Sequence, residues 1–125
     1  MSVADLRVDR QPAFVLHRRA WRETSLLLEL LTRDFGRVGV IARGARGGRR
    51  GPGACSQAFQ PLLVSWSGRT DLKTLTAAEA VSAAPAIVGE RLYTALYVNE
   101  LLVRLLLQHD AHRAVFDAYA GLLPA

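Results

Sequence analysis

Six arginines lie in a stretch of the chain that contains no carboxylate. There is no acidic residue between Asp34 and Asp71, and the arginines there are Arg37, Arg43, Arg46, Arg49, Arg50 and Arg69. A guanidinium is always charged, and its planar fork donates paired hydrogen bonds to phosphate oxygens. A GC-rich genome would also raise the arginine content, but it would not by itself remove the acids. The pattern therefore favours a surface that meets a polyanion.

A second group of arginines surrounds a tryptophan. Arg18, Arg19 and Arg22 lie within four positions of Trp21. In a groove for a single nucleic-acid strand, arginines neutralise phosphates and an aromatic ring stacks on a base. The same residues would otherwise be ordinary surface charges beside a ring that covers one end of a folded domain. The sequence leaves both interpretations of Trp21 open.

The charge is unevenly distributed along the chain. The 125 residues include 16 Lys and Arg against 11 Asp and Glu, a formal net charge of +5. Residues 1–80 hold 13 cations and 7 anions, whereas residues 81–125 hold 3 cations and 4 anions. The basic surface is therefore expected within the first two-thirds of the chain.

Several kinds of chemistry find no support in the sequence. It contains neither a G-x-S-x-G nucleophile elbow nor a G-x-x-x-x-G-K-[ST] phosphate loop, so we expect no enzyme. One cysteine, Cys55, with three histidines cannot form the common zinc sites, and no metal or cofactor is expected. No apolar run approaches the roughly 20 residues of a membrane span, and the N-terminus does not resemble a secretory signal. These features favour the cytoplasm.

Apolar residues alternate with polar ones over the first 80 positions, which predicts short strands. In the second predicted strand Leu26, Leu28 and Leu30 share one face, and Asp34-Phe35-Gly36 then gives a turn into the third. The predicted strands are Ala13–Arg18, Ser25–Thr32, Arg37–Arg43, Pro61–Ser67 and Leu72–Thr76. The expected core is Leu26, Leu28, Val38, Val40, Leu62, Val64 and Trp66.

From Ala83 the apolar spacing becomes helical. One helix is predicted over Gly89–Gln108 and a second over His112–Leu122, with Asp110 or its neighbour as the cap of the second. Tyr93 and Tyr97 are expected to pack between the helices and the strands.

Together these elements predict a mainly β chain with a C-terminal α portion. Residues 1–80 would form a five-stranded OB-fold barrel, and residues 81–125 the start of an incomplete helical domain. An OB-fold binds oligonucleotides on its second and third strands and on the loops between strands 1–2 and 4–5. That mapping places Arg18 to Arg22 in the first loop, Arg37 and Arg43 on the third strand, and Arg69 in the last loop.

Ordered stretches of the chain carry a family resemblance. They are Ala13-Phe14-Val15-Leu16, Thr32-Arg33-Asp34-Phe35-Gly36, Ala42-Arg43-Gly44-Ala45-Arg46, Gln60-Pro61-Leu62-Leu63, Asp71-Leu72-Lys73-Thr74-Leu75 and Asn99-Glu100-Leu101-Leu102-Val103-Arg104. In this order, over nearly the whole chain, they resemble the N-terminal portion of the bacterial RecO family of recombination and repair mediators.

The resemblance implies a function without enzymatic activity. RecO-like proteins bind single- and double-stranded DNA and anneal complementary strands in the cytoplasm, at the nucleoid. They work with RecR, in some lineages with RecF, and with single-stranded DNA-binding protein (SSB), and they help to place RecA on strands that SSB covers. Some relatives carry zinc-binding cysteines in a later region, and none can be assigned here.

This sequence departs from the family at two places. It ends within what would be the helical domain, so we expect a fragment, and Gly47-Gly48-Arg49-Arg50-Gly51-Pro52-Gly53 is richer in glycine than the family pattern. Two alternative functions stay open. One is an adaptor whose basic face binds an acidic protein tail or RecR, with little DNA affinity of its own. The other is an RNA-binding OB module, which contacts to the 2′-hydroxyl would distinguish.

Overall fold

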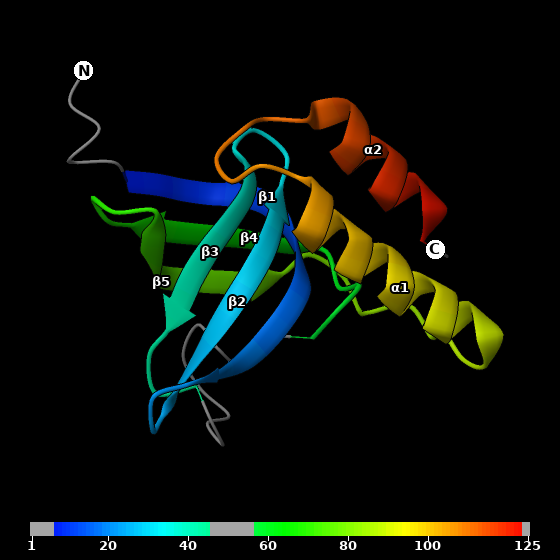
Figure 1. Ribbon diagram of the computed structural model, residues 1–125, viewed down its shortest axis with the longest axis horizontal. Helices are drawn as coiled ribbons and strands as arrows, with labels where there is room; N and C mark the ends of the chain where they lie inside the picture. The colour runs from blue at the N-terminus through cyan, green and yellow to red at the C-terminus, as the bar shows by residue number, and fades with distance from the viewer. Residues whose placement is uncertain (1–6, 46–56, 124–125) are drawn as a thin grey trace.

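A computed structural model describes residues 7–45 and 57–123 (Figure 1). Its strands are β1 (Arg7–Trp21), β2 (Ser25–Thr32), β3 (Gly36–Ala42), β4 (Leu62–Ser67) and β5 (Leu72–Ala80), followed by the helices α1 (Glu90–Leu105) and α2 (Arg113–Leu122). The strands close into a barrel in the order β1-β2-β3-β5-β4, in which only the β3–β5 pair is parallel. The predicted OB-fold barrel followed by helices is confirmed.

The first strand is much longer than predicted. Its first half pairs with β4 and its second half with β2, and the register shifts between Val8 and Gln11 and again between Val15 and His17. Such bulges bend a strand and let it serve two neighbours in turn. The sequence pattern showed only the central part of β1, because pairing with β4 joins residues that are far apart in the chain.

The barrel interior contains the expected core. Leu28, Val38, Val40, Leu62, Val64 and Trp66 are buried, and Leu26 packs partly buried against them. Phe35, from the β2–β3 turn, meets Trp66 edge-on with ring centroids 5.6 Å apart. The strand phases assigned to β2, β3 and β4 from the sequence are therefore correct.

A second apolar cluster joins the helices to the outside of the barrel. Phe14 of β1 lies 5.4 Å from Phe116 and 5.0 Å from Tyr119 of α2, measured between ring centroids. The Tyr119 hydroxyl donates a 2.7 Å hydrogen bond to Oδ1 of the buried Asn99 in α1. Burial raises the pKa of the Tyr119 phenol, so it remains a donor. β1 thus buries side chains on both of its faces.

Two expectations for the helical part are wrong. Tyr93 and Tyr97 are 76% and 63% exposed, because α1 packs through Leu92, Ala95 and Val98, and the two tyrosines lie beyond that face. Tyr119 fills the expected position between helices and barrel. The residue before α2 is His112, without a side-chain cap, so Asp110 is not the cap.

Candidate nucleic-acid interface

The ladder register aligns residues of four strands in one row on the outside of the barrel. Arg19 pairs with Leu27, Leu27 with Ile41, and Ile41 with Thr74. Directly cross-strand partners point to the same side of a sheet. This side is the outer one, because the inward positions of β2 are Leu28 and Leu30. Nearer the end of the barrel, Trp21 pairs with Ser25 across the β1–β2 turn.

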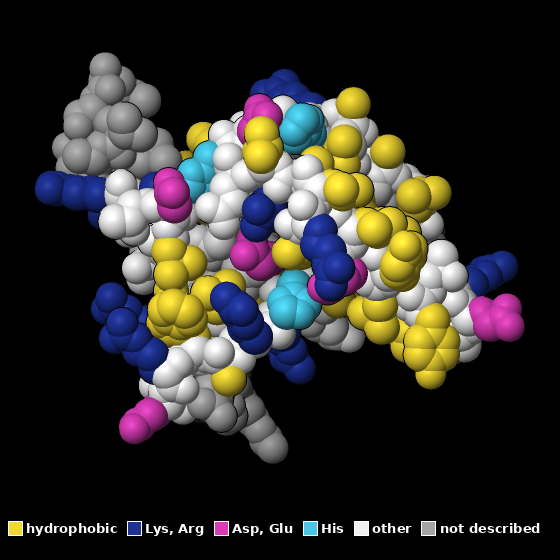
Figure 2. All heavy atoms as spheres, viewed as in Figure 1, with side chains coloured by type: hydrophobic (Ala, Val, Ile, Leu, Met, Phe, Trp, Pro, Cys, Tyr) yellow, Lys and Arg dark blue, Asp and Glu magenta, His cyan; other side chains and the backbone are white. Residues whose placement is uncertain are grey.

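This end of the barrel contains an open hollow of about 440 Å³, here called the barrel-end hollow. Its walls come from the β1–β2 turn, the end of β3 and the start of β5. It is lined by Trp21, Arg22, Thr24, Ser25, Ile41, Arg43, Gly44, Thr70, Leu72, Lys73 and Thr74. Figure 2 shows Lys and Arg side chains gathered at the left, beside the end of β3 in Figure 1, with an acidic side chain below them near the β1–β2 turn. Among the residues that the structure describes, the lining combines cations, hydroxyls and an aromatic ring, and contains no carboxylate.

Arg22 holds an unusual backbone conformation in the β1–β2 turn. Its backbone φ is 54°, a left-handed value that residues other than glycine rarely adopt. Its guanidinium carbon lies 6.0 Å from the centroid of the Trp21 ring. Strained residues of this kind are concentrated at functional sites. The turn thus presents a cation and a ring together at the mouth of the hollow.

Lys73, the chain's single lysine, also lines the hollow, although it was not among the expected DNA-binding residues. It is only 4% exposed, and its ammonium donates a 3.2 Å hydrogen bond to the Gly68 carbonyl. That bond fixes the β4–β5 turn, in which Thr70 lines the hollow and Arg69 is exposed. The sequence did contain a signal for this residue. Lys73 is two positions from Leu75 and so faces the same, inward side of the strand, where lysine is seldom buried.

The α1–α2 linker covers the other end of the outer β2–β3 face. The Arg37 guanidinium lies 2.8 Å from Glu29 Oε1, and its Nε donates to the Leu106 carbonyl at 2.9 Å. The His109 amide donates to the Arg37 carbonyl at 2.8 Å. Both side chains of the ion pair are only 15% exposed. Arg37 was expected to face a ligand, but its side chain is engaged in holding the linker, so we leave it out of the interface.

The remaining expected residues fall into three groups. Arg43 lines the barrel-end hollow with Trp21 and Arg22. Arg18 lies in a separate hollow with His17 and Leu96, because the bulge before His17 changes its side of β1. Arg46, Arg49 and Arg50, with Cys55, are outside the described residues. The structure thus brings together Trp21, Arg22 and Arg43 in the hollow. Arg19 lies in the outer row that leads through Leu27 to Ile41, and Arg69 precedes Thr70 in the β4–β5 turn.

Comparison with known proteins identifies the family of this chain. The family described as "Recombination protein O N terminal" matches residues 6–84. The chain belongs to the RecO family. It is 50% identical over 117 residues to the DNA repair protein RecO of Aromatoleum aromaticum, covering 94% of this chain and 49% of the relative. It is 52% identical over 115 residues to RecO of Methylococcus capsulatus, covering 92% and 48%.

The RecO relatives are about twice as long as this chain. RecO of Nitrosococcus oceani, for example, is 50% identical over 120 residues, which cover 96% of this chain but 49% of the relative. The chain spans about half the length of the curated relatives it matches. The barrel lies within the matched RecO segment, and both helices follow it.

Two further findings concern the described residues alone. Within residues 7–45 and 57–123, no group of three or more His, Cys, Asp or Glu side chains could hold a metal ion. Neither α1 nor α2 is long and apolar enough to cross a membrane.

Proposed function

We propose that this chain is a DNA-binding part of a recombination mediator, and that it binds DNA through the barrel-end hollow and the arginines around it. The observation that carries the proposal is the meeting of Trp21, Arg22 and Arg43 in one hollow, whose described lining residues include no carboxylate. Three segments distant in sequence supply this lining. A basic surface of this kind neutralises phosphates and releases counterions, which gives binding without sequence preference.

Membership of the RecO family supports the biological role. The relatives carry the name DNA repair protein. We therefore propose that the chain binds single- and double-stranded DNA, favours annealing of complementary strands, and contributes to placing RecA on strands covered by SSB, together with RecR. No step of this role requires a catalytic residue, because binding alone brings strands and partner proteins together.

The direct experiment measures binding to labelled oligonucleotides with competitors. Single-stranded DNA, duplex DNA and RNA of one sequence are compared by fluorescence anisotropy, and an acidic peptide is added as competitor. We expect DNA binding that is independent of sequence and resists the peptide. Tight binding of the peptide with little affinity for any oligonucleotide would instead identify a protein adaptor. A clear preference for RNA over DNA would identify an RNA-binding module.

A further inference from the structure

We propose that the outer face of α1 binds a second copy of this chain, with the two α1 helices antiparallel about a two-fold axis at Tyr97. The outer face is defined here as Glu90, Tyr93, Tyr97, Leu101 and Arg104. Each copy would contribute the same surface to the contact. This inference is independent of the proposed function, because it concerns a surface on the helices and needs no nucleic acid.

Two tyrosines lie on this face. α1 packs on the rest of the molecule through residues that include Leu92, Ala95 and Leu102. Tyr93 and Tyr97 are on the other side of the helix and are largely exposed. Figure 1 shows the first turns of α1 projecting beyond the barrel at the lower right. Tyrosine is enriched in the centre of protein interfaces, because its ring supplies apolar area and its hydroxyl can stay hydrogen-bonded.

Charged residues at the two ends of the outer face indicate which partner fits. Glu90, in the first turn of α1, lies seven positions before Tyr97, and Arg104, in the last turn, lies seven positions after it. Seven residues make about two helical turns, so the three side chains follow one row along the helix. The row has an acid at one end, a base at the other and a tyrosine in the middle.

Such a row is complementary to itself in one orientation only. In an antiparallel pair centred on Tyr97, Glu90 of one copy faces Arg104 of the other at both ends, which is the isologous form of two-fold contacts. A parallel pair would bring like charges together at both ends, which is unfavourable. Arg104 Nε already lies 3.5 Å from Glu100 Oε1 in its own helix, so in the dimer it would lie between two carboxylates.

Apolar side chains extend the contact beside this row. Tyr93 and Leu101 are each four positions from Tyr97, so Tyr93 of one copy would lie opposite Leu101 of the other. Leu96, which is 45% exposed, borders the face. A single pair of helices about 24 Å long makes a smaller contact than the roughly 1,200–2,000 Å² of stable interfaces. The dimer should therefore dissociate on dilution.

Exchanging the charges tests the orientation, with association measured by sedimentation velocity over a concentration series. Glu90→Arg and Arg104→Glu are prepared as separate variants. Each should associate roughly 3- to 10-fold more weakly than the unaltered chain, because its own dimer has like charges at both ends. An equimolar mixture should recover the original association at the same total concentration, since both ends of the mixed dimer pair opposite charges.

Arg91→Glu is the matched control for these variants. Arg91 is exposed on α1 but lies outside the row, and the substitution changes the charge as much as Arg104→Glu does. It should associate like the unaltered chain. Circular dichroism shows whether each variant is folded.

A cysteine cross-link tests the position of the axis without relying on charge. Tyr97→Cys, in a chain whose Cys55 is replaced by alanine, should form a disulfide-linked dimer on mild oxidation, because position 97 faces its own counterpart. Arg91→Cys in the same background should cross-link much more slowly. Should a charge variant fail to fold, the cross-link decides alone.

Four results would overturn the inference. The first is a chain that is monomeric at every concentration, which would leave the outer face to a different partner. The second is association that is unchanged in both charge variants. The third is a mixture of the folded charge variants that associates no better than either variant alone. The fourth is equal cross-linking at positions 97 and 91. Each would leave the proposed DNA binding untouched.

Discussion

At the scale of single residues, two arginines in the first half of the chain have different surroundings. Arg22 has a left-handed backbone conformation and lines the barrel-end hollow. Arg37 is largely buried in an ion pair with Glu29 and in a bond to the linker. Residue type alone could not separate them, because the difference lies in what each guanidinium contacts. Each leads to a different prediction.

Replacing Arg22 with glycine should separate binding from folding. Glycine adopts a φ of 54° without strain, so Arg22→Gly should be about 1–2 kcal/mol more stable than Arg22→Ala, which keeps the strain. Both variants should bind single-stranded DNA more weakly, and to the same extent, because both lack the cation. Urea unfolding and anisotropy measure the two effects. A glycine variant less stable than the alanine variant would show that Arg22 is not strained as described.

Arg37→Leu should lower stability and leave DNA binding unchanged. It leaves the largely buried Glu29 without its partner and releases the Leu106 carbonyl, so we expect a loss of about 1–3 kcal/mol in unfolding free energy. DNA affinity at constant folded fraction should be unchanged. Urea unfolding and the salt dependence of binding provide the check. A flatter salt dependence without loss of stability would return Arg37 to the interface.

At the scale of elements, the helices are held on the barrel by the α1–α2 linker as well as by the Phe14 cluster. Asp34 contributes from the β2–β3 turn, where it lies 2.7 Å from the Arg113 guanidinium at the start of α2. A Cβ added at Gly36 would lie 2.0 Å from the carbonyl oxygen of Asp110 in the linker. This packing leaves no room for a side chain at Gly36.

Gly36→Ala should therefore be strongly destabilising. The added Cβ would meet the Asp110 carbonyl, and φ is already 70°, so we expect a loss of roughly 2–5 kcal/mol. Gly89→Ala is the matched control, because its φ is 64° but nothing lies within 4 Å of the Cβ position. It should lose only about 1–2 kcal/mol. Equal losses in urea unfolding would mean that the linker does not press on β3.

The elements also show what the sequence could and could not predict. The bounds of β2, Ser25–Thr32, follow from its own alternation and the adjacent turn, and the structure matches them. The first half of β1 is held by pairing with β4, which is distant in sequence, so the alternation of residues within β1 did not show where the strand begins. In the site, Trp21 and Arg22 were found because they are neighbours in sequence. Thr74 was not, because only the parallel β3–β5 pairing places it beside Ile41.

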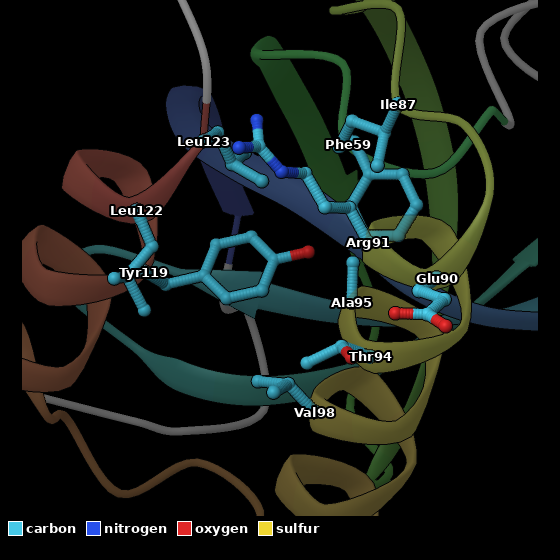
Figure 3. A pocket seen from close by; sticks show the side chains of 10 residues that line it. All are labelled: Phe59, Ile87, Glu90, Arg91, Thr94, Ala95, Val98, Tyr119, Leu122 and Leu123. Carbon is cyan, nitrogen blue, oxygen red and sulfur yellow. The ribbon is translucent and has the colours of Figure 1, made fainter.

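At the scale of the whole molecule, the helical side exposes much apolar surface. Figure 3 shows a groove in which Tyr119 and Leu122 of α2 face Ala95 and Val98 of α1. Its volume is about 580 Å³. The large apolar side chains exposed on the helices or next to them include Val88, Tyr93, Tyr97, Leu105, Leu107 and Leu122. Figure 2 shows hydrophobic side chains gathered over the helices on the right, and exposed apolar surface favours association between molecules.

We therefore expect the chain to self-associate as its concentration rises. Sedimentation velocity over a concentration series should show species larger than the monomer. The double variant Tyr97→Ser with Leu105→Ser should shift the distribution toward monomer, because both side chains are exposed and their loss should not disturb the barrel. A chain that stays monomeric throughout the series would contradict the expectation.

The central claim, that DNA phosphates are bound at the barrel end, is tested most directly by the salt dependence of single-strand binding. Arg19, Arg22 and Arg43 are replaced together by alanine, and a control variant replaces Arg33, Arg91 and Arg104, which removes the same charge elsewhere. Each phosphate contact contributes a slope of about −0.7 to log affinity against log salt. The barrel-end variant should therefore flatten the slope by up to ~2, whereas the control should leave it nearly unchanged. Equal slopes in the two variants would contradict the claim.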